Sequence, residues 1–288
     1  MQVDDLQRIV WLASFPKSGN TWVRTFLASY FLGDVDINHL RRFTTGDGRL
    51  DFFHRAAGGN YDSSSDFQTY AKVRSKALEL IAASRDGHHF VKTHTRIQNV
   101  SGIDLIPPRL TAAAVYIVRN PFDVAPSLAR HNNVDIDQVI EIMTSRENMM
   151  SSGKGIWEFI GRWDEHVHCW TEAAGLPHVM VRYEDLHTNP KKGFQPIFDF
   201  LRIKVDPKKL RQALKASSFD ALRKQESERG FIERPPHMEK FFHTGKAGSW
   251  REALNDAQVA KIHQAFEPAL QKYYPEIVEE TASIAASV

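Results

Sequence analysis

Residues 9–32 constrain the fold most, because they read as a strand, a tight polar turn and a helix. Residues 9–15 (IVWLASF) are a short apolar run rich in strand formers, and a helical pattern begins at about Thr21. The turn between them, residues 16–20, has the sequence PKSGN. Strand, turn and helix in this order are the beginning of a βαβ unit, the building block of parallel sheets.

The same order recurs at residues 112–119 (AAAVYIVR), which predict a second strand leading into a helix. Asn120 is expected to cap that helix, with Pro121 at its first position and Asp123 three residues after the cap. Pro126 is an awkward interior residue that is expected to kink or delay the helix.

Two shorter strands are predicted at residues 88–94 and 178–186, and a helix-like run follows the second at 191–203. Strands that alternate with helices predict an α/β fold, here a single domain with a mainly parallel central sheet flanked by helices. Ligands of such sheets bind at the carboxyl ends of the strands. The candidate binding segments are therefore residues 16–21, 92–94, 119–127 and 183–185.

Two long stretches fit the alternation poorly. Residues 33–75 are rich in Gly, Asp and Ser, and residues 223–250 combine Arg-Pro-Pro with several glycines and mixed charge. Irregular segments of this length are usually lids or binding loops, or are partly disordered. Flexible surface loops are the alternative interpretation of both.

Composition narrows the class of protein. Lys and Arg number 37 against 35 Asp and Glu, so the formal net charge is +2, and 42% of the residues are hydrophobic. These values are typical of a globular chain and disfavour a broad basic face for nucleic acid. Cys169 is the single cysteine, which excludes an internal disulfide and fits a reducing compartment.

The N-terminal segment shows no targeting or membrane signal. Asp4 and Asp5 stand where a signal peptide has a positive start, and the apolar stretch is far shorter than the roughly 18 residues that span a bilayer. We therefore expect a cytoplasmic protein without a membrane or nucleic-acid partner, forming one domain over residues 1–288.

The PKSGN turn has the features of an anion-binding site. Successive backbone N–H groups at a strand-to-helix turn form a concavity for anions, and the helix dipole adds positive potential. Gly19 allows the backbone to approach a ligand, and Lys17 adds a mobile cation. Short polar side chains are supplied by Ser18, Asn20 and Thr21. The alternative is an ordinary turn with an incidental lysine.

This turn is not a Walker A loop. The chain contains no G-x-x-x-x-G-K-[ST] sequence, and Lys17 precedes Gly19. An NTPase usually has an aspartate at the end of the second apolar strand to help hold magnesium, whereas this strand ends in Arg119. A nucleotide kinase or NTPase is therefore the less favoured interpretation.

Segments at these strand ends resemble one known family. FPKSGNTW (15–22) is similar to the 5′-phosphosulfate motif of the cytosolic-type sulfotransferases, which use 3′-phosphoadenosine 5′-phosphosulfate (PAPS). RNPFDVAPS (119–127) resembles their 3′-phosphate motif, and VKTH (91–94) resembles the segment with their catalytic histidine. Over residues 9–273 the family's order continues with GRWDEHVHCW, RYEDLHTNPKK, SSFDALRK and GKAGSW.

The resemblance implies a sulfotransferase with a P-loop-like phosphosulfate-binding turn. It implies in-line transfer of the sulfuryl group from PAPS to a hydroxyl of a small organic acceptor, with no metal. His94 is then the general base, a role that suits imidazole because it titrates near neutral pH. Lys17 is implied at the bridging oxygen, and Lys92, on the same face of the strand as His94, at the 5′ end of the donor.

The resemblance also implies which residues bind the nucleotide. Arg119 and Ser127 are implied at the 3′-phosphate, where a guanidinium fork matches phosphate geometry. Trp22 and Phe219 are implied to sandwich adenine and Tyr183 to contact its edge, although all three also fit ordinary core packing. The donor-binding set is Lys17, Ser18, Gly19, Asn20, Thr21, Trp22, Arg119, Ser127, Tyr183, Ser217, Phe219, Gly245 and Lys246.

Two segments depart from the family. Its C-terminal loop usually carries Arg-Lys-Gly on the 3′-phosphate, and the corresponding residues here are His243, Thr244 and Gly245, with Lys246 next as a possible substitute. The run after the tryptophan, residues 250–256 (WREALND), lacks the Thr-Val pair of the family's dimer motif, so no oligomeric state is implied. A nucleotide-binding module without catalysis is the third interpretation, opposed by the complete set of Lys17, Lys92 and His94.

Other residue groups give weaker signals. The paired histidines at 88–89 and at 166 and 168 lack a third nearby ligand, so no metal is expected. An aromatic or apolar acceptor is suggested by aromatic side chains, which fit a core equally well. These candidates are the aromatics of residues 52–70, Trp157, Phe159, Trp163, Phe241 and Phe242.

Overall fold

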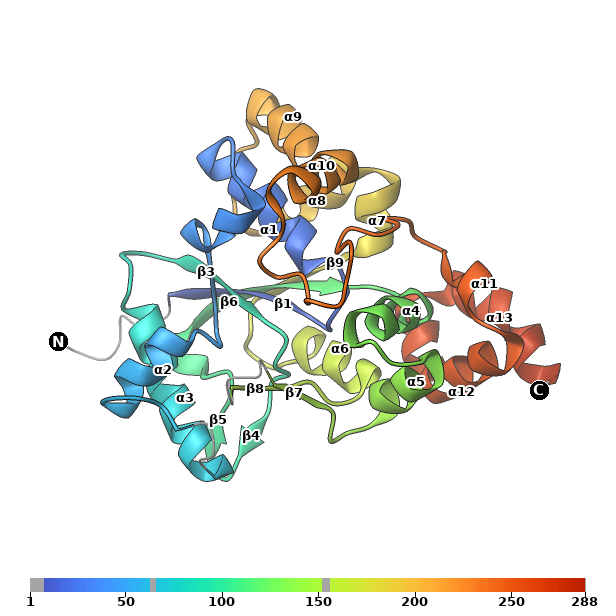
Figure 1. Ribbon diagram of the computed structural model, residues 1–288, viewed down its shortest axis with the longest axis horizontal. Coiled ribbons are helices and arrows are strands. Elements are labelled where there is room, and N and C mark those ends of the chain that lie inside the picture. The colour runs from blue at the N-terminus through green and yellow to red at the C-terminus, as the bar shows by residue number, and fades with distance from the viewer. Residues whose placement is uncertain (1–7, 63–65, 152–155, 288) are drawn as a thin grey trace.

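The structure is a computed structural model and describes residues 8–62, 66–151 and 156–287. Its centre is a parallel five-stranded sheet in the order β2-β3-β1-β6-β9. The strands are β1 (Ile9–Ser14), β2 (Thr44–Gly46), β3 (His89–Thr93), β6 (Thr111–Val118) and β9 (His178–Arg182). Helices cover both faces of the sheet (Figure 1). The predicted α/β class with a parallel central sheet is confirmed.

Alternate residues of the central strands enter two separate hydrophobic layers, as the period of a strand requires. Trp11 of β1 and Tyr116 of β6 pack on one face, whereas Leu12 and Val115 pack on the other. The Leu12 side is covered by α1 (Asn20–Leu32), α8 (Pro190–Phe200) and α9 (Pro207–Ala216). The Trp11 side is covered by α2 (Leu50–Ala57), α3 (Phe67–Ala82), α4 (Pro121–Asn132), α5 (Ile136–Thr144), α6 (Trp163–Thr171) and α12 (Asp256–Tyr273).

Shorter elements complete the described chain. Two small hairpins pair β4 (Asn99–Val100) with β5 (Ile103–Asp104) and β7 (Met149–Ser151) with β8 (Trp157–Phe159). The remaining helices are α7 (Tyr183–Thr188), α10 (Phe219–Arg229), α11 (Trp250–Ala253) and α13 (Pro275–Ser287), with 3₁₀ turns at Ile37–Arg42 and Pro108–Leu110. Among the described residues, none of the helices combines the length and apolar character needed to cross a bilayer.

Three of the four predicted strands are confirmed to within a residue or two. The fourth, predicted at 178–186, is too long because β9 stops at Arg182 and Tyr183 begins α7. The neighbouring strand β6 ends at the same position in the sheet, because its last residue, Val118, is paired with Arg182. Glu184 and Asp185 then favour a helix start, because acidic side chains stabilise the N-terminal turn.

The prediction of an irregular segment at 33–75 is wrong. This stretch contains β2, α2 and the start of α3, and Phe52 and Phe53 of α2 are buried in the core. The glycines and serines between these short elements interrupt the hydrophobic periodicity of the sequence, so the elements were not predicted. In the other segment α10 extends to Arg229, and residues 230–249 contain no helix or strand, as expected.

Helix α4 begins where predicted. The Asn120 side chain accepts a hydrogen bond from the Asp123 backbone N–H at 2.8 Å, and Pro121 is the first helical residue. The expected delay at Pro126 is wrong, because the helix passes through it. Proline removes one hydrogen bond there, and burial of side chains such as Phe122 and Leu128 maintains the helix.

Candidate active site

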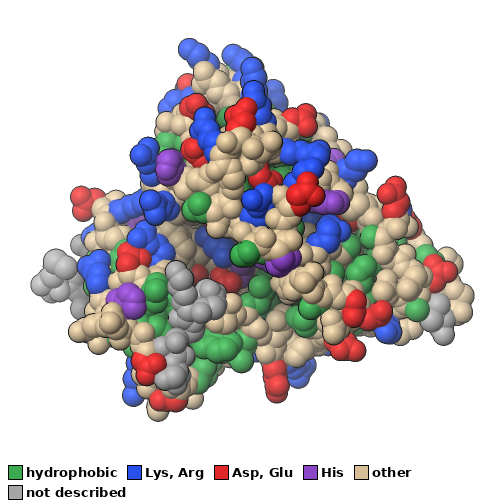
Figure 2. Space-filling model, viewed as in Figure 1, with side chains coloured by type: hydrophobic (Ala, Val, Ile, Leu, Met, Phe, Trp, Pro, Cys, Tyr) green, Lys and Arg blue, Asp and Glu red, His purple; other side chains and the backbone are tan. Residues whose placement is uncertain are grey.

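The carboxyl ends of β1, β3, β6 and β9 open into one pocket of about 720 Å³. Lys, Arg and His side chains edge the hollow in the middle of the face shown in Figure 2. Of the residues predicted for the site, all but Ser18 and Lys246 line this pocket. Ser18 is fully buried, and the Lys246 carbonyl accepts a hydrogen bond from Arg119. The residues brought together are Lys17, Gly19, Asn20, Thr21, Trp22, Lys92, His94, Arg119, Ser127, Tyr183, Ser217, Phe219 and Gly245.

The turn after β1 has the backbone of an anion site. Lys17 and Gly19 have φ angles of 65° and 97°, so a left-handed residue stands on each side of Ser18. A side chain at position 19 would put its Cβ 2.6 Å from the Tyr183 ring, so glycine is required for space as well as conformation. No side chain caps α1, which leaves the first N–H groups of the helix available to a ligand.

Several buried polar atoms around this turn have no hydrogen-bond partner among the residues that the structure describes. They are Ser18 Oγ, Asn20 Oδ1, Arg24 Nε and Arg119 Nε. The Asn20 amide itself is fixed, because its Nδ2 donates to the Leu12 carbonyl at 2.9 Å. Buried polar groups are normally satisfied, so this concentration of unpaired atoms fits a site that binds a polar ligand.

Lys17 is a half-buried cation without a carboxylate partner among the described residues. Its Nζ lies 3.4 Å from His131 Nδ1 and 4.0 Å from the centre of the Phe241 ring. Burial, and then the charges of Arg119 and Arg130, lower the pKa of Lys17 to about 7. An anion bound here would favour the charged ammonium, and would itself be stabilised by that charge.

His94 follows the last residue of β3 and has a defined tautomer. Its Nδ1 lies 2.7 Å from the Ser14 carbonyl oxygen, which can only accept, so Nδ1 carries the proton and Nε2 is the basic atom. Burial and the nearby Lys92 hold the pKa of His94 well below its usual range. The imidazole is therefore neutral and can accept a proton at Nε2.

His166 holds the backbone of His94 in place. His166 Nε2 donates to the His94 carbonyl at 3.0 Å, so its Nδ1 accepts the 2.8 Å hydrogen bond from the Tyr116 hydroxyl. Burial lowers the pKa of His166 to about 4, which keeps it neutral. This role accounts for one histidine of the 166 and 168 pair. Within the described part of the chain, no cluster of three metal-ligating side chains occurs.

A buried ion pair fixes the end of β3 just before His94. Asp47 accepts hydrogen bonds from Arg74 at 2.7 Å and from the Thr93 hydroxyl at 2.6 Å, and both charged side chains are only 1% exposed. Thr93 in turn accepts from the Thr95 backbone N–H. The residues on either side of His94 are thus tied to the core.

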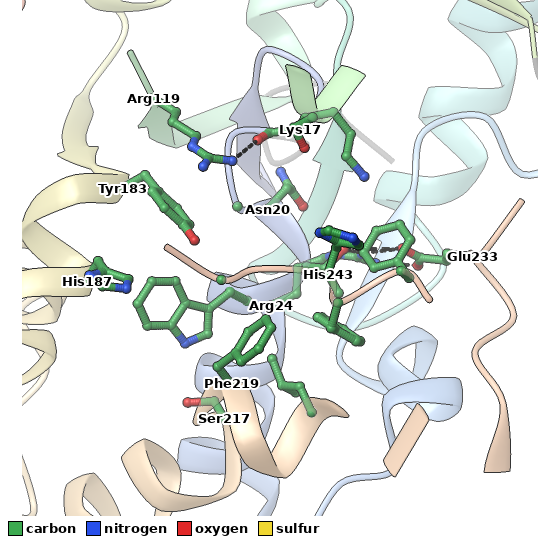
Figure 3. A pocket seen from close by; sticks show the side chains of 18 of the residues that line it. Lys17, Asn20, Arg24, Arg119, Tyr183, His187, Ser217, Phe219, Glu233 and His243 are labelled. Atoms are coloured by element: carbon green, nitrogen blue, oxygen red, sulfur yellow. Dashed lines mark hydrogen bonds and ion pairs between the residues drawn. The ribbon is translucent and has the colours of Figure 1, made fainter. Parts of the chain in front are cut away.

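Arg119 connects three segments that are distant in sequence. Its guanidinium lies 4.3 Å from the centre of the Tyr183 ring, donates to the Lys17 carbonyl at 3.3 Å and donates to the Lys246 carbonyl at 3.2 Å. Figure 3 shows Arg119 and Lys17 on one side of the pocket and Ser217 and Phe219 on the opposite side. Tyr183 and His187 of α7 lie along the edge between them.

The C-terminal loop is anchored over the pocket by Asp123. This buried carboxylate accepts hydrogen bonds from the Gly248 N–H at 2.7 Å and from the Trp250 N–H at 3.0 Å. Gly245, with φ of 61°, packs so closely on Phe219 that an added Cβ would lie 2.2 Å from the ring. The loop therefore reaches from α4 to α10 across the mouth of the pocket.

Several pocket residues were missed by the sequence analysis: Arg24, Arg130, His131, Glu158 and Glu233. Arg24 and Arg130 each lie three residues after a predicted site residue on a helix, Thr21 and Ser127, so helical spacing is a signal that would have found them. Glu158 and Glu233 are in a short hairpin and an irregular segment. No periodic pattern marks either position.

Most of the aromatic candidates for the acceptor pocket belong to the core instead. Phe241 and Phe242 line the pocket, whereas none of the others does among the residues described. Trp163, for example, is fully buried and donates its indole N–H to the Arg119 carbonyl at 3.2 Å. The sequence could not separate these roles, because aromatic side chains supply the same apolar area to a core and to a pocket.

Comparison with known proteins points to one family. A family model described as "Sulfotransferase domain" matches residues 7–274. Mouse sulfotransferase 2A6 is 24% identical over 278 residues, which cover 92% of this chain and 85% of the relative. A flavonol 3-sulfotransferase of Flaveria bidentis is 22% identical over 91% of this chain and 81% of its own length.

Solved structures agree in fold. Retinol dehydratase in complex with androsterone and the inactive cofactor PAP superposes with a TM-score of 0.62 at 20% identity, covering 93% of this chain and 83% of that one. Mouse sulfotransferase SULT7A1 complexed with PAP gives 0.61 at 18% identity, covering 98% and 91%. Because the family match spans most of the sequence, and the pocket lies at the strand ends where its motifs fall, this chain belongs to the sulfotransferase family.

Proposed function

We propose that this chain, acting as one domain, transfers the sulfuryl group of PAPS to a hydroxyl of a small acceptor. The observation that carries the proposal is a neutral His94 whose basic Nε2 has no hydrogen-bond partner in the described part of the chain, in a pocket that also holds Lys17, Lys92 and Arg119. The geometry supplies a proton acceptor and a concentration of positive charge at one place. Cys169 is the single cysteine of the sequence and a free, half-buried thiol, which supports a cytoplasmic location.

Each group has one part in the reaction. His94 Nε2 takes the proton of the acceptor hydroxyl as the acceptor oxygen bonds to sulfur. The bond between sulfur and the bridging oxygen breaks, and both bonding electrons remain on the phosphate. The Lys17 ammonium stabilises the charge that develops there, and a fixed cation at such a place can contribute several kcal/mol. Lys92 orients the transferring group.

The nucleotide would be held by the remaining pocket residues. The helix N-terminus at Asn20 and Thr21 suits the 5′-phosphate, and Arg119 with Ser127 suits the 3′-phosphate. Trp22 and Phe219 would sandwich adenine, and Trp22 already meets the Tyr183 ring edge-on at 5.6 Å. Two solved relatives contain PAP, the product of PAPS, which supports this assignment.

The other two interpretations are not favoured. A kinase or NTPase would use a carboxylate at the end of this strand to help hold magnesium, whereas β6 is followed by Arg119. A non-catalytic module has no need of a histidine fixed as His94 is, with Nδ1 bonded to Ser14 and its carbonyl bonded to His166.

Thermal unfolding with adenosine 3′,5′-bisphosphate tests the proposal. Ligand at one hundred times its Kd is expected to stabilise the protein by about 2.7 kcal/mol, a rise in Tm of several degrees, and Mg-ATP is expected to give a smaller shift. The measurement is differential scanning fluorimetry across a ligand titration. Equal or larger shifts with Mg-ATP, or none with the bisphosphate, would contradict the assignment.

The acceptor is proposed to be neutral and polar, which differs from the aromatic or apolar alcohol expected from the sequence. Two ion pairs lie near His94: Lys92 with Glu158 at 3.1 Å, and Arg24 with Glu233 at 2.6 Å. An apolar acceptor would remove these groups from water without replacing the hydrogen bonds they make to it. The free-energy cost is about 1–3 kcal/mol for each group left without a partner. Both carboxylates are paired with cations, so neither is left to attract a cationic acceptor.

Two six-membered-ring alcohols test this acceptor class. With PAPS as donor, myo-inositol is expected to give a kcat/KM at least about 10-fold above that of cyclohexanol, because its extra hydroxyls bond to the charged side chains. Glu233→Gln should reduce that ratio, whereas Glu172→Gln, in a remote ion pair with Lys272, should not. Preference for cyclohexanol in the unmodified protein would overturn the polar assignment. Initial rates of PAP release provide the measurement.

A further inference from the structure

The C-terminal loop offers few charges to a 3′-phosphate. Where the family usually has arginine and lysine, this chain has His243 and Thr244. Partial burial, and then Arg130, Arg223 and Lys240, lower the pKa of His243, so it is neutral at physiological pH. Arg119 is then the one guanidinium that the sequence assigned to this dianionic phosphate, and Lys246 contacts Arg119 through its backbone carbonyl.

Arg130 lies where a second guanidinium is needed. It is on α4, three residues after Ser127, so the two side chains share a helix face. Arg130 lines the pocket with Arg119, Ser127 and His243, and it is exposed to solvent. In the described part of the chain its guanidinium has neither a carboxylate partner nor a hydrogen bond.

Electrostatic effects place Arg130 close to three other pocket groups. It depresses the pKa of Lys17 together with Arg119, and it depresses the pKa of His243. The pKa of Arg130 is itself lowered, first by partial burial and then by Arg119. Positive groups that repel one another around a hollow are stabilised when an anion enters it.

The described carboxylates of the pocket already have other partners than Arg130. The described acidic residues that line the pocket are Glu158 and Glu233, which pair with Lys92 and Arg24. The neighbouring Asp123 accepts hydrogen bonds from the Gly248 and Trp250 backbone and lies on the Arg119 side. A guanidinium in this position, unpaired among the described residues, is suited to bind an anionic ligand.

We propose that Arg130 binds the 3′-phosphate of the donor and replaces the cations missing from the C-terminal loop. Recognition of this phosphate then depends on the end of β6 and on α4, through Arg119, Ser127 and Arg130. The loop around Gly245 is left with packing on Phe219 as its main part in binding. This inference rests on the proposed function, since it assigns a residue to the same donor.

Calorimetric titration of two nucleotides isolates the 3′-phosphate. Adenosine 3′,5′-bisphosphate and adenosine 5′-monophosphate differ only in that group. The Kd of the monophosphate divided by the Kd of the bisphosphate therefore measures how strongly the protein recognises the 3′-phosphate. Arg130→Gln is expected to weaken bisphosphate binding by about 10- to 100-fold and monophosphate binding by less than about 3-fold, because one charge-assisted contact is lost. The ratio should therefore fall by at least about 3-fold.

Two matched variants serve as controls. Arg211→Gln removes the same charge from an exposed position on α9 outside the pocket, and should leave the ratio unchanged. His243→Ala removes the side chain that stands where the family usually has its loop arginine. This change should alter the ratio by less than about 3-fold. Because the Arg130 side chain has no hydrogen bond or ion pair with any described residue, Arg130→Gln should unfold at the same temperature as the unmodified protein.

The outcomes separate this inference from the proposed function. Equal weakening of both nucleotides by Arg130→Gln, or no weakening, would overturn the assignment of Arg130 while bisphosphate binding still supported the enzyme. If the ratio fell in His243→Ala and not in Arg130→Gln, the C-terminal loop would be the part that recognises the 3′-phosphate, and the assignment of Arg130 would be overturned. An unmodified protein that binds the two nucleotides equally would exclude a 3′-phosphate site of any kind.

Discussion

Replacing His94 with glutamine is expected to lower the rate of sulfuryl transfer by roughly 10²- to 10⁴-fold, the usual contribution of a general base. Glutamine is a polar side chain close in size to histidine, but it provides no atom basic enough to take the acceptor proton. Nucleotide affinity should persist, because Lys17, Arg119 and the helix N-terminus remain. The measurement is single-turnover transfer from PAPS, with bisphosphate titration of the same variant.

His168→Gln is the matched control, since His168 is half-buried outside the pocket and contacts Tyr273. It should keep nearly full activity. If His94→Gln also kept full activity, His94 would not be the base. The low pKa of His94 adds a further expectation: the base stays unprotonated below its usual range, so loss of kcat on its acid side should begin well below pH 6.5.

Lys17→Met is expected to lower kcat by roughly 10²- to 10³-fold, the cost of removing one preorganised charge from a transition state. Methionine keeps much of the apolar volume against Phe241 but cannot stabilise the bridging oxygen. Rates measured at saturating PAPS separate this effect from weaker donor binding. Lys204→Met, which changes an exposed lysine outside the pocket, should leave kcat unchanged. An unchanged kcat in Lys17→Met would contradict the role.

The lowered pKa of Lys17 also predicts how donor binding depends on pH. With its pKa at about 7 rather than 10.5, Lys17 in the free protein loses its proton as pH rises through 7, whereas a bound anion favours the protonated form. Bisphosphate affinity should therefore fall between about pH 7 and 9 as binding becomes coupled to proton uptake. Lys17→Met should remove most of this slope. A bisphosphate affinity that does not change over this interval would show that Lys17 is charged throughout.

The same shift affects stability in the opposite direction. Between pH 7 and 10.5 the unfolded chain keeps a proton on Lys17 that the folded, ligand-free chain has lost. Because the unfolded state then binds more protons, the contribution of Lys17 to the free energy of unfolding rises with pH across this interval. The charged ammonium is thus retained at neutral pH at some cost to the ligand-free fold, as is common at functional sites.

Local patterns were sufficient for the strands and turns that carry the donor-binding motifs. IVWLASF followed by PKSGN gave β1 and the turn before α1, and Asn120 with Pro121 marked the start of α4. They failed where structure depends on partners. The end of β9 was misplaced because the limit of its pairing is set by β6, and α2 was missed because its amphipathic pattern is brief.

The sequence by itself determined the family, the parallel sheet and the strand-end residues that line the pocket, because a strand followed by a polar turn fixes which side chains lie at the edge of a sheet. The tertiary structure decided their chemical states. Only three-dimensional contacts show that Ser14 sets the tautomer of His94, or that Arg119 and Arg130 act with burial on Lys17. Tautomers and pKa values depend on burial and on charges distant in the chain, which a local pattern does not contain.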